Sequence, residues 1–189
     1  GALEGIAREL GNALVAPIVK LVPEGSYDPP RGHMASAGTI SLREETFQAV
    51  LYDVGMSLKA HGFENIIYIG DSGGNVRGMS NAAAQINETA GTTIAHHIPE
   101  FYEYGAVSTW MGEELGLAET TRDGFHDSFV ITAIMMVTDA SSVRYDQRVK
   151  AGSATINGLS IEPKEAAIET GKKLLQFRVD QTSAAIRAA

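Results

Sequence analysis

Two short stretches carry residues whose types and spacing suit chemistry at a bound ligand. In residues 70–75, Asp71, Ser72 and Asn75 surround two glycines, directly after a continuous apolar run. Glycines let the backbone approach a ligand closely, and a helix that follows presents free N–H groups. In the structural alternative, Asp71 or Ser72 caps that helix and the glycines only make the turn. No G-x-S-x-G elbow surrounds Ser72, so we do not predict serine hydrolysis.

The second stretch is His126-Asp127. An imidazole ordinarily titrates near neutral pH, so His126 can transfer protons or bind a metal, and Asp127 adds a carboxylate beside it. In the structural alternative, both residues lie at a helix start, where the helix dipole favours an aspartate. The adjacent pair His96-His97 falls in a predicted strand. Neighbouring strand residues point to opposite faces, so we do not expect these two imidazoles to share one metal ion.

The spacing of apolar residues predicts the elements that must position these side chains. Helices and strands alternate, which indicates an α/β protein with a mostly parallel sheet covered by helices. The predicted helices are residues 1–11, 41–62, 75–89, 100–117 and 163–187, and the predicted strands are residues 13–19, 65–70 and 92–98. Residues 125–137 form either a further helix or a buried segment.

A long loop precedes the second predicted helix. Residues 22–37 hold three of the six prolines and show no periodicity, and loops of this length in compact domains are often functional. His33 lies in this loop. Ser41 and Glu44 have the spacing of a capping box, in which each side chain accepts a hydrogen bond from the other residue's backbone N–H.

Composition limits the class of protein. A chain of 189 residues with 44% hydrophobic and 20% charged residues predicts one globular domain. The net charge of −8 argues against a nucleic-acid partner, and no apolar run reaches the roughly 20 residues that span a membrane. The absence of cysteine excludes disulfides and thiolate metal sites. The chain starts inside a helical pattern, so we expect a strand and a metal motif upstream of it.

Several of these stretches together resemble the creatininase family. The order and spacing are similar to the family patterns "lVaP…H..pGTiSl" and "sl..hGf..iv..nGHGGN", with a weaker similarity continuing to the final helix. The matching segments are residues 13–17, Gly32-His33, residues 38–42, 57–63, 70–75 and 123–126, and Val143-Arg144. The resemblance covers essentially the whole chain.

The resemblance implies a three-layer α/β/α fold, often assembled as a hexamer, that hydrolyses C–N amide bonds of small, sometimes cyclic, substrates. It implies two zinc or manganese ions that share a water and lower its pKa. The residues that it assigns to substrate binding are His33, Ser72, Gly73, Gly74 and Asn75. His126 and Asp127 are its catalytic candidates, and Asp71 is its candidate metal ligand.

The chain departs from the family pattern at the metal ligands. An early E-x-H…D segment is absent, Ser72 stands where the family has the histidine of G-H-G-G-N, and Ile131 stands where a carboxylate would fall. Two hypotheses follow. The chain is a metal-dependent amidohydrolase that acts on a small amide, or it is an inactive homologue, without a bound metal, that keeps the fold for ligand binding or assembly. In both cases we expect a homo-oligomer in the cytoplasm, or in the periplasm if a signal peptide precedes the chain.

Overall fold

The computed structural model describes all residues, Gly1–Ala189, and they form two compact units. Unit 1 comprises Gly1–Val15 and Glu103–Ser183, and unit 2 comprises Ala16–Tyr102 and Ala184–Ala189. No helix combines the length and apolar character that a membrane span requires.

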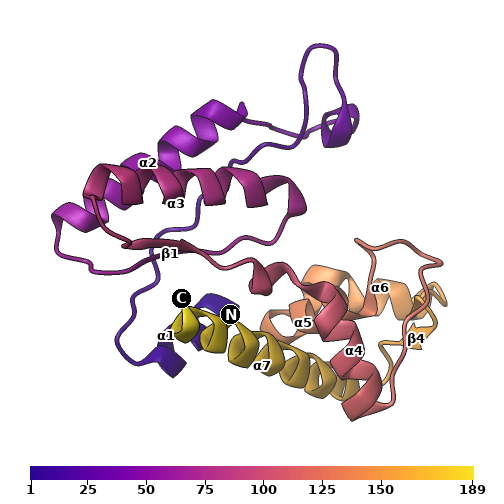
Figure 1. The fold of residues 1–189 in the computed structure, drawn as a ribbon. Helices are drawn as coiled ribbons and strands as arrows, with labels where there is room; N and C mark the ends of the chain where they lie inside the picture. The colour runs from indigo at the N-terminus through magenta and orange to yellow at the C-terminus, as the bar shows by residue number, and fades with distance from the viewer. The chain divides into compact units, whose positions relative to one another are not determined.

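Unit 2 is built on one β-α-β crossover. Strand β1 (Ile66–Tyr68) leads through helix α3 (Val76–Ala90) to strand β2 (Ala95–His97), which pairs with β1 in parallel. The register sets Ile66 opposite Ala95 and Tyr68 opposite His97, so both strands end at the same level. Helix α2 (Glu44–Ala60) packs beside α3, and both helices contact the strands (Figure 1). The predicted α/β class is confirmed here. The three-layer arrangement stays a prediction, because β1 and β2 alone form the parallel sheet.

Tyr68 anchors the end of β1 inside the core of unit 2. Its side chain is only 8% exposed, and its hydroxyl donates a 2.6 Å hydrogen bond to the Leu51 carbonyl of α2. Burial raises the pKa of Tyr68 to about 12, because the phenolate would be desolvated. The strand end is therefore fixed against α2, and with it the start of the turn that follows.

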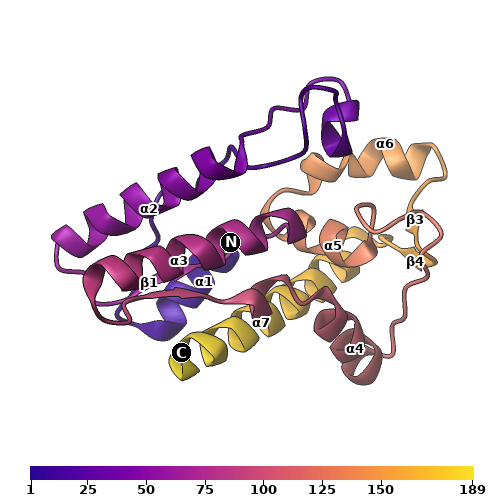
Figure 2. The same ribbon diagram turned by 45° about the horizontal axis from the view of Figure 1, so that its top comes forward.

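Unit 1 is mainly helical. Its long helix α7 (Lys164–Ala188) packs against α5 (Phe129–Thr138), and the backbones approach so closely that a Cβ on Gly171 would lie 2.1 Å from the Ala133 carbonyl oxygen (Figure 2). The fully buried side chains of its core include Met111, Val130 and Leu174. The remaining elements of the unit are α1 (Ala2–Leu10), α4 (Tyr104–Leu115), α6 (Tyr145–Lys150) and the hairpin of β3 (Thr155–Ile156) and β4 (Leu159–Ser160). Short 3-10 turns complete the chain: η1 (Gly32–Ala35), η2 (Gly73–Asn75), η3 (Pro99–Tyr102) and η4 (Ala140–Val143).

Two local predictions were wrong. Residues 13–19 form no strand, because no neighbouring strand pairs with their backbone, and Leu14 is 80% exposed. The capping box at Ser41 and Glu44 does not form either. Helix α2 begins at Glu44 with Arg43 at the N-cap and no side-chain cap, while the Ser41 hydroxyl is used inside the preceding loop.

Candidate functional site

The turn after β1 has the geometry of a ligand site. It leaves the carboxyl end of β1 and passes through η2 directly into α3, so backbone N–H groups at the helix start lie where open α/β sheets bind ligands. Ser72 is the N-cap of η2, yet its hydroxyl caps no N–H group. The structural alternative for Ser72 is therefore wrong, and its half-buried hydroxyl is available to another partner. Asp71 beside it is exposed.

Asn75 carries an unsatisfied polar atom in this turn. The residue is only 7% exposed, and its side-chain Oδ1 has no hydrogen-bond partner. A buried acceptor without a donor costs about 1–3 kcal/mol, so such an atom in a native fold marks a place for a water or a ligand. A group that donates an N–H or O–H within the turn would satisfy Asn75 Oδ1.

The two glycines bring other backbone close to the turn. A Cβ on Gly73 would lie 3.3 Å from the Tyr102 ring, and one on Gly74 would lie 3.7 Å from both the Pro23 carbonyl oxygen and Ser72 Oγ. The start of the long loop thus lies against the turn. The resemblance placed Ser72, Gly73, Gly74 and Asn75 in one site, and the structure brings these residues together with that loop.

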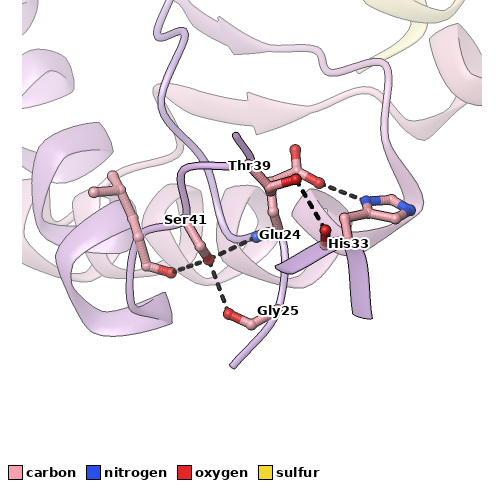
Figure 3. A network of polar contacts seen from close by, with 6 residues as sticks. Glu24, Gly25, His33, Thr39 and Ser41 are labelled. Atoms are coloured by element: carbon pink, nitrogen blue, oxygen red, sulfur yellow. Dashed lines mark hydrogen bonds and ion pairs between the residues drawn. The ribbon is translucent and has the colours of Figure 1, made fainter. Parts of the chain in front are cut away.

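The long loop is closed by backbone and hydroxyl hydrogen bonds (Figure 3). At its base, the Leu42 N–H donates to the Val22 carbonyl over 3.1 Å, and the Glu24 N–H donates to Ser41 Oγ over 2.9 Å. The Ser41 hydroxyl in turn donates to the Gly25 carbonyl over 2.9 Å. The loop extends beyond the first turn of α2 (Figures 1 and 2).

His33 is paired within this loop with a residue that sequence analysis missed. Its ring atom Nδ1 lies 2.7 Å from Glu24 Oε2, and its backbone N–H donates to the Glu24 backbone carbonyl over 3.0 Å. The Glu24 side chain is 26% exposed and that of His33 is 61% exposed. No local sequence pattern indicates this pair, because its members are nine positions apart and the closure of the loop depends on Gly25. That glycine has φ +139°, and a Cβ there would lie 2.0 Å from the Arg31 carbonyl oxygen.

A second histidine lies at the carboxyl end of β2. His97 Nδ1 is 2.9 Å from the Ser80 hydroxyl of α3. Burial lowers the pKa of His97 below its ordinary value, and the nearby Glu100 carboxylate opposes this shift. Burial therefore disfavours the charged imidazolium form of His97. The side chain faces α3, so it forms no metal pair with His96.

His126 and Asp127 belong to unit 1, where they are exposed and directly precede α5. The helix start after them is capped twice: Ser128 Oγ accepts from the Ile131 N–H over 3.0 Å, and the Glu119 carboxylate accepts from the Phe129 N–H. Neither His126 nor Asp127 caps this helix. Ile131 lies half-buried in its first turn, so the position that is acidic in the family is apolar here.

The segment before His126 is pinned to the β3–β4 hairpin by Asn157. Asp123 and Asn157 each donate a backbone N–H to the other's side-chain oxygen over 2.7 Å, and Asn157 Nδ2 donates to the Gly124 carbonyl. Phe125 then stacks edge-on against Tyr104, with ring centroids 5.3 Å apart, and against the His126 ring at 5.7 Å. The His126 ring therefore lies at the end of a row of three rings.

The donor set does not fit a two-metal centre. No three His, Asp or Glu side chains lie together in a way that could hold one metal ion. The side chain at the family's histidine position is a neutral hydroxyl, Ser72, and the one at its carboxylate position is a hydrocarbon, Ile131. Zinc and manganese prefer imidazole and carboxylate ligands, so neither of these side chains replaces the missing donors.

The fold defines an α/β protein, and the turn after β1 is a candidate ligand site at the carboxyl ends of the parallel strands. The family model described as creatinine amidohydrolase matches residues 2–186, nearly the whole chain. The chain belongs to the creatininase family. No curated protein sequence matches it.

Proposed function

We propose that this protein hydrolyses a C–N amide bond in a small, possibly cyclic, substrate. The observation that carries the proposal is the family match over residues 2–186. The turn in residues 70–75 adds support, because it places helix N–H groups at the carboxyl end of a parallel strand.

The polar groups of the turn suit an amide. An amide offers a carbonyl oxygen and, in most cases, an N–H on the same carbon. Backbone N–H groups of the turn are the proposed donors for the carbonyl oxygen and for the negative charge that develops on it during attack. Asn75 Oδ1, buried and without a donor, is an acceptor for the amide N–H. Ser72 and the backbone at Gly73 and Gly74 complete the proposed substrate contacts.

The histidine and aspartate of unit 1 are proposed as further catalytic groups. His126 matches a family histidine, its exposed ring contacts the Phe125 ring, and Asp127 is the next residue in the chain. The family resemblance implies dependence on zinc or manganese, with Asp71 as the candidate ligand. Counting the metal bound per chain tests this part of the proposal. Assembly as a homo-oligomer is proposed on the same resemblance, and a monomeric mass in light scattering would exclude it.

A second candidate function is ligand binding without catalysis. It is favoured by one observation: the two family ligand positions hold Ser72 and Ile131 together. An inactive homologue would keep the turn and its unsatisfied Asn75 oxygen, and would bind an amide without releasing an amine.

The test compares Asn75→Ala with the matched control Asn81→Ala, which changes an exposed asparagine of α3, the helix that Asn75 precedes. Ring opening of creatinine and lactams, and conversion of primary amides to carboxylates and ammonia, are followed by proton NMR. We expect Asn75→Ala to lower kcat/KM by about tenfold, the loss of one hydrogen bond, and Asn81→Ala to leave it unchanged. Equal activities of the two variants would remove Asn75 from the substrate site. Saturable binding without hydrolysis would favour the second candidate.

A further inference from the structure

We propose that Glu24 and His33 form a proton-transfer dyad: the Glu24 carboxylate holds the proton on His33 Nδ1, and His33 Nε2 takes a proton from the water that attacks the amide. The inference rests on the proposed function, since it adds a base and its positioning residue to that reaction.

The geometry of the pair fixes the tautomer of the imidazole. Nδ1 of His33 lies 2.7 Å from Glu24 Oε2, the distance of a charge-assisted hydrogen bond. An ionised carboxylate only accepts hydrogen bonds, so the proton between these atoms belongs to Nδ1. In the neutral ring Nε2 then carries the lone pair, and this is the atom that can accept a proton.

The backbone on both sides of the pair is also fixed. The Thr39 hydroxyl donates to the His33 carbonyl over 2.9 Å, and the Glu24 N–H donates to Ser41 Oγ over 2.9 Å (Figure 3). The backbone N–H of His33 donates to the backbone carbonyl of Glu24, which links the two residues a second time. A surface ion pair between two mobile side chains loses most of its Coulomb energy to side-chain entropy and solvent. Here hydrogen bonds hold the main chains of both residues, so only the side-chain torsions remain to be ordered when the carboxylate meets the imidazole.

The loop of residues 22–37, which carries Glu24 and His33, starts beside the proposed substrate turn. Pro23, the neighbour of Glu24, places its carbonyl oxygen 3.7 Å from the Cβ position of Gly74. Val22 and Leu42, at the two ends of the loop, pack against the core of unit 2. The loop that carries the proposed base thus starts beside the turn that carries the proposed amide-binding groups, and both belong to unit 2.

The step balances without a further reactant. The water oxygen forms a bond to the amide carbon while one water proton moves to His33 Nε2, giving a tetrahedral intermediate and an imidazolium ion whose Nδ1–H faces the Glu24 carboxylate. The C–N bond then breaks, and the proton on Nε2 passes to the leaving nitrogen. The products are a carboxylic acid and an amine, and His33 returns to its neutral form.

The tautomer is measured directly by nitrogen-15 NMR of the imidazoles at pH about 8.5, where histidines with the ordinary pKa near 6.5 are neutral. We expect His33 to show a protonated Nδ1 and an unprotonated Nε2 in the wild type. In Glu24→Gln the amide can also donate to Nδ1, so the proton shifts toward Nε2. Glu64→Gln changes an exposed carboxylate in unit 2 and leaves the His33 signals unchanged. A wild-type His33 protonated on Nε2 would overturn the dyad.

Kinetics then separate the dyad from the proposed function. On any amide that the wild type hydrolyses, we expect Glu24→Gln and His33→Gln to lower kcat by about 100-fold or more with little change in KM. The controls Glu64→Gln and His61→Gln, both at exposed positions, keep the wild-type kcat. Wild-type turnover that survives His33→Gln would overturn the dyad and leave the proposed function standing. No turnover by the wild type on creatinine, lactams or primary amides would overturn both.

Discussion

Replacing Tyr68 by phenylalanine tests whether the end of β1 is anchored in the core as described. The change removes one hydroxyl that donates to the Leu51 carbonyl over 2.6 Å, and keeps the ring. At pH 7 the lost hydrogen bond should lower the free energy of unfolding by about 1 kcal/mol. The effect at high pH should be the opposite, because burial raises the pKa of Tyr68 to about 12.

The sign follows from comparing the folded and unfolded chains. An unfolded tyrosine has a pKa near 10, so above pH about 10 the unfolded chain releases a proton that the folded chain retains. Folding stability from Tyr68 is therefore complete below pH about 10 and is lost as the pH rises toward 12. At pH 11 this loss is between about 1 and 2 kcal/mol, and it is absent from Tyr68→Phe.

Urea unfolding followed by circular dichroism at pH 7 and pH 11 measures both effects. We expect Tyr68→Phe to be less stable than the wild type at pH 7, and equal or more stable at pH 11. The control Tyr27→Phe changes a tyrosine that is 56% exposed, and its difference from the wild type should not depend on pH. The reasoning is refuted if the gap between Tyr68→Phe and the wild type is the same at both pH values.

Two further changes test unit 1. Gly171→Ala should destabilise it by about 2 kcal/mol, because the new Cβ would lie 2.1 Å from the Ala133 carbonyl oxygen and would push α5 from α7. The control Gly112→Ala, at an exposed helix position, should be neutral or stabilising by up to about 1 kcal/mol. Equal thermal unfolding of the two variants would contradict the close packing. Asn157→Ala should lower the free energy of unfolding by about 2 kcal/mol, because it removes the side-chain hydrogen bonds to Asp123 and Gly124 and places alanine at φ +48°. Asn157→Gly should lower it less, because glycine tolerates that φ. Trp110 fluorescence, which reports on unit 1, would follow both, and an alanine variant as stable as the glycine variant would contradict the account of Asn157.

The sequence allowed the elements around β1 to be predicted because their patterns are local. The apolar run before Gly70 and the helical spacing after Asn75 each depend on residues within one element, and both elements formed with ends a few residues from the expected ones. The strand predicted at residues 13–19 failed for the opposite reason. Its apolar composition is typical of a strand, but a strand also requires a partner, and the exposure of Leu14 and Ile18 shows that no neighbour covers it.

The candidate site was predicted in part for the same reason. Ser72 and Asn75 were identified because the family motif is contiguous, and the structure added the unsatisfied oxygen of Asn75. Glu24 was missed because its contact with His33 forms only when the loop closes. The Ser41 hydroxyl, expected at a helix cap, instead accepts from the Glu24 N–H, and sequence spacing alone could not distinguish these two uses.

The central claim, hydrolysis of a small amide, is tested most directly by incubating the purified wild-type protein with creatinine, lactams and primary amides and measuring the hydrolysis products by NMR. Zinc and manganese are supplied in parallel samples, and bound metal per chain is counted in each. The account predicts saturable turnover of at least one of these amides above a heat-denatured control. Binding of amides without hydrolysis, with or without either metal, would contradict it and would establish the protein as a ligand-binding member of the family.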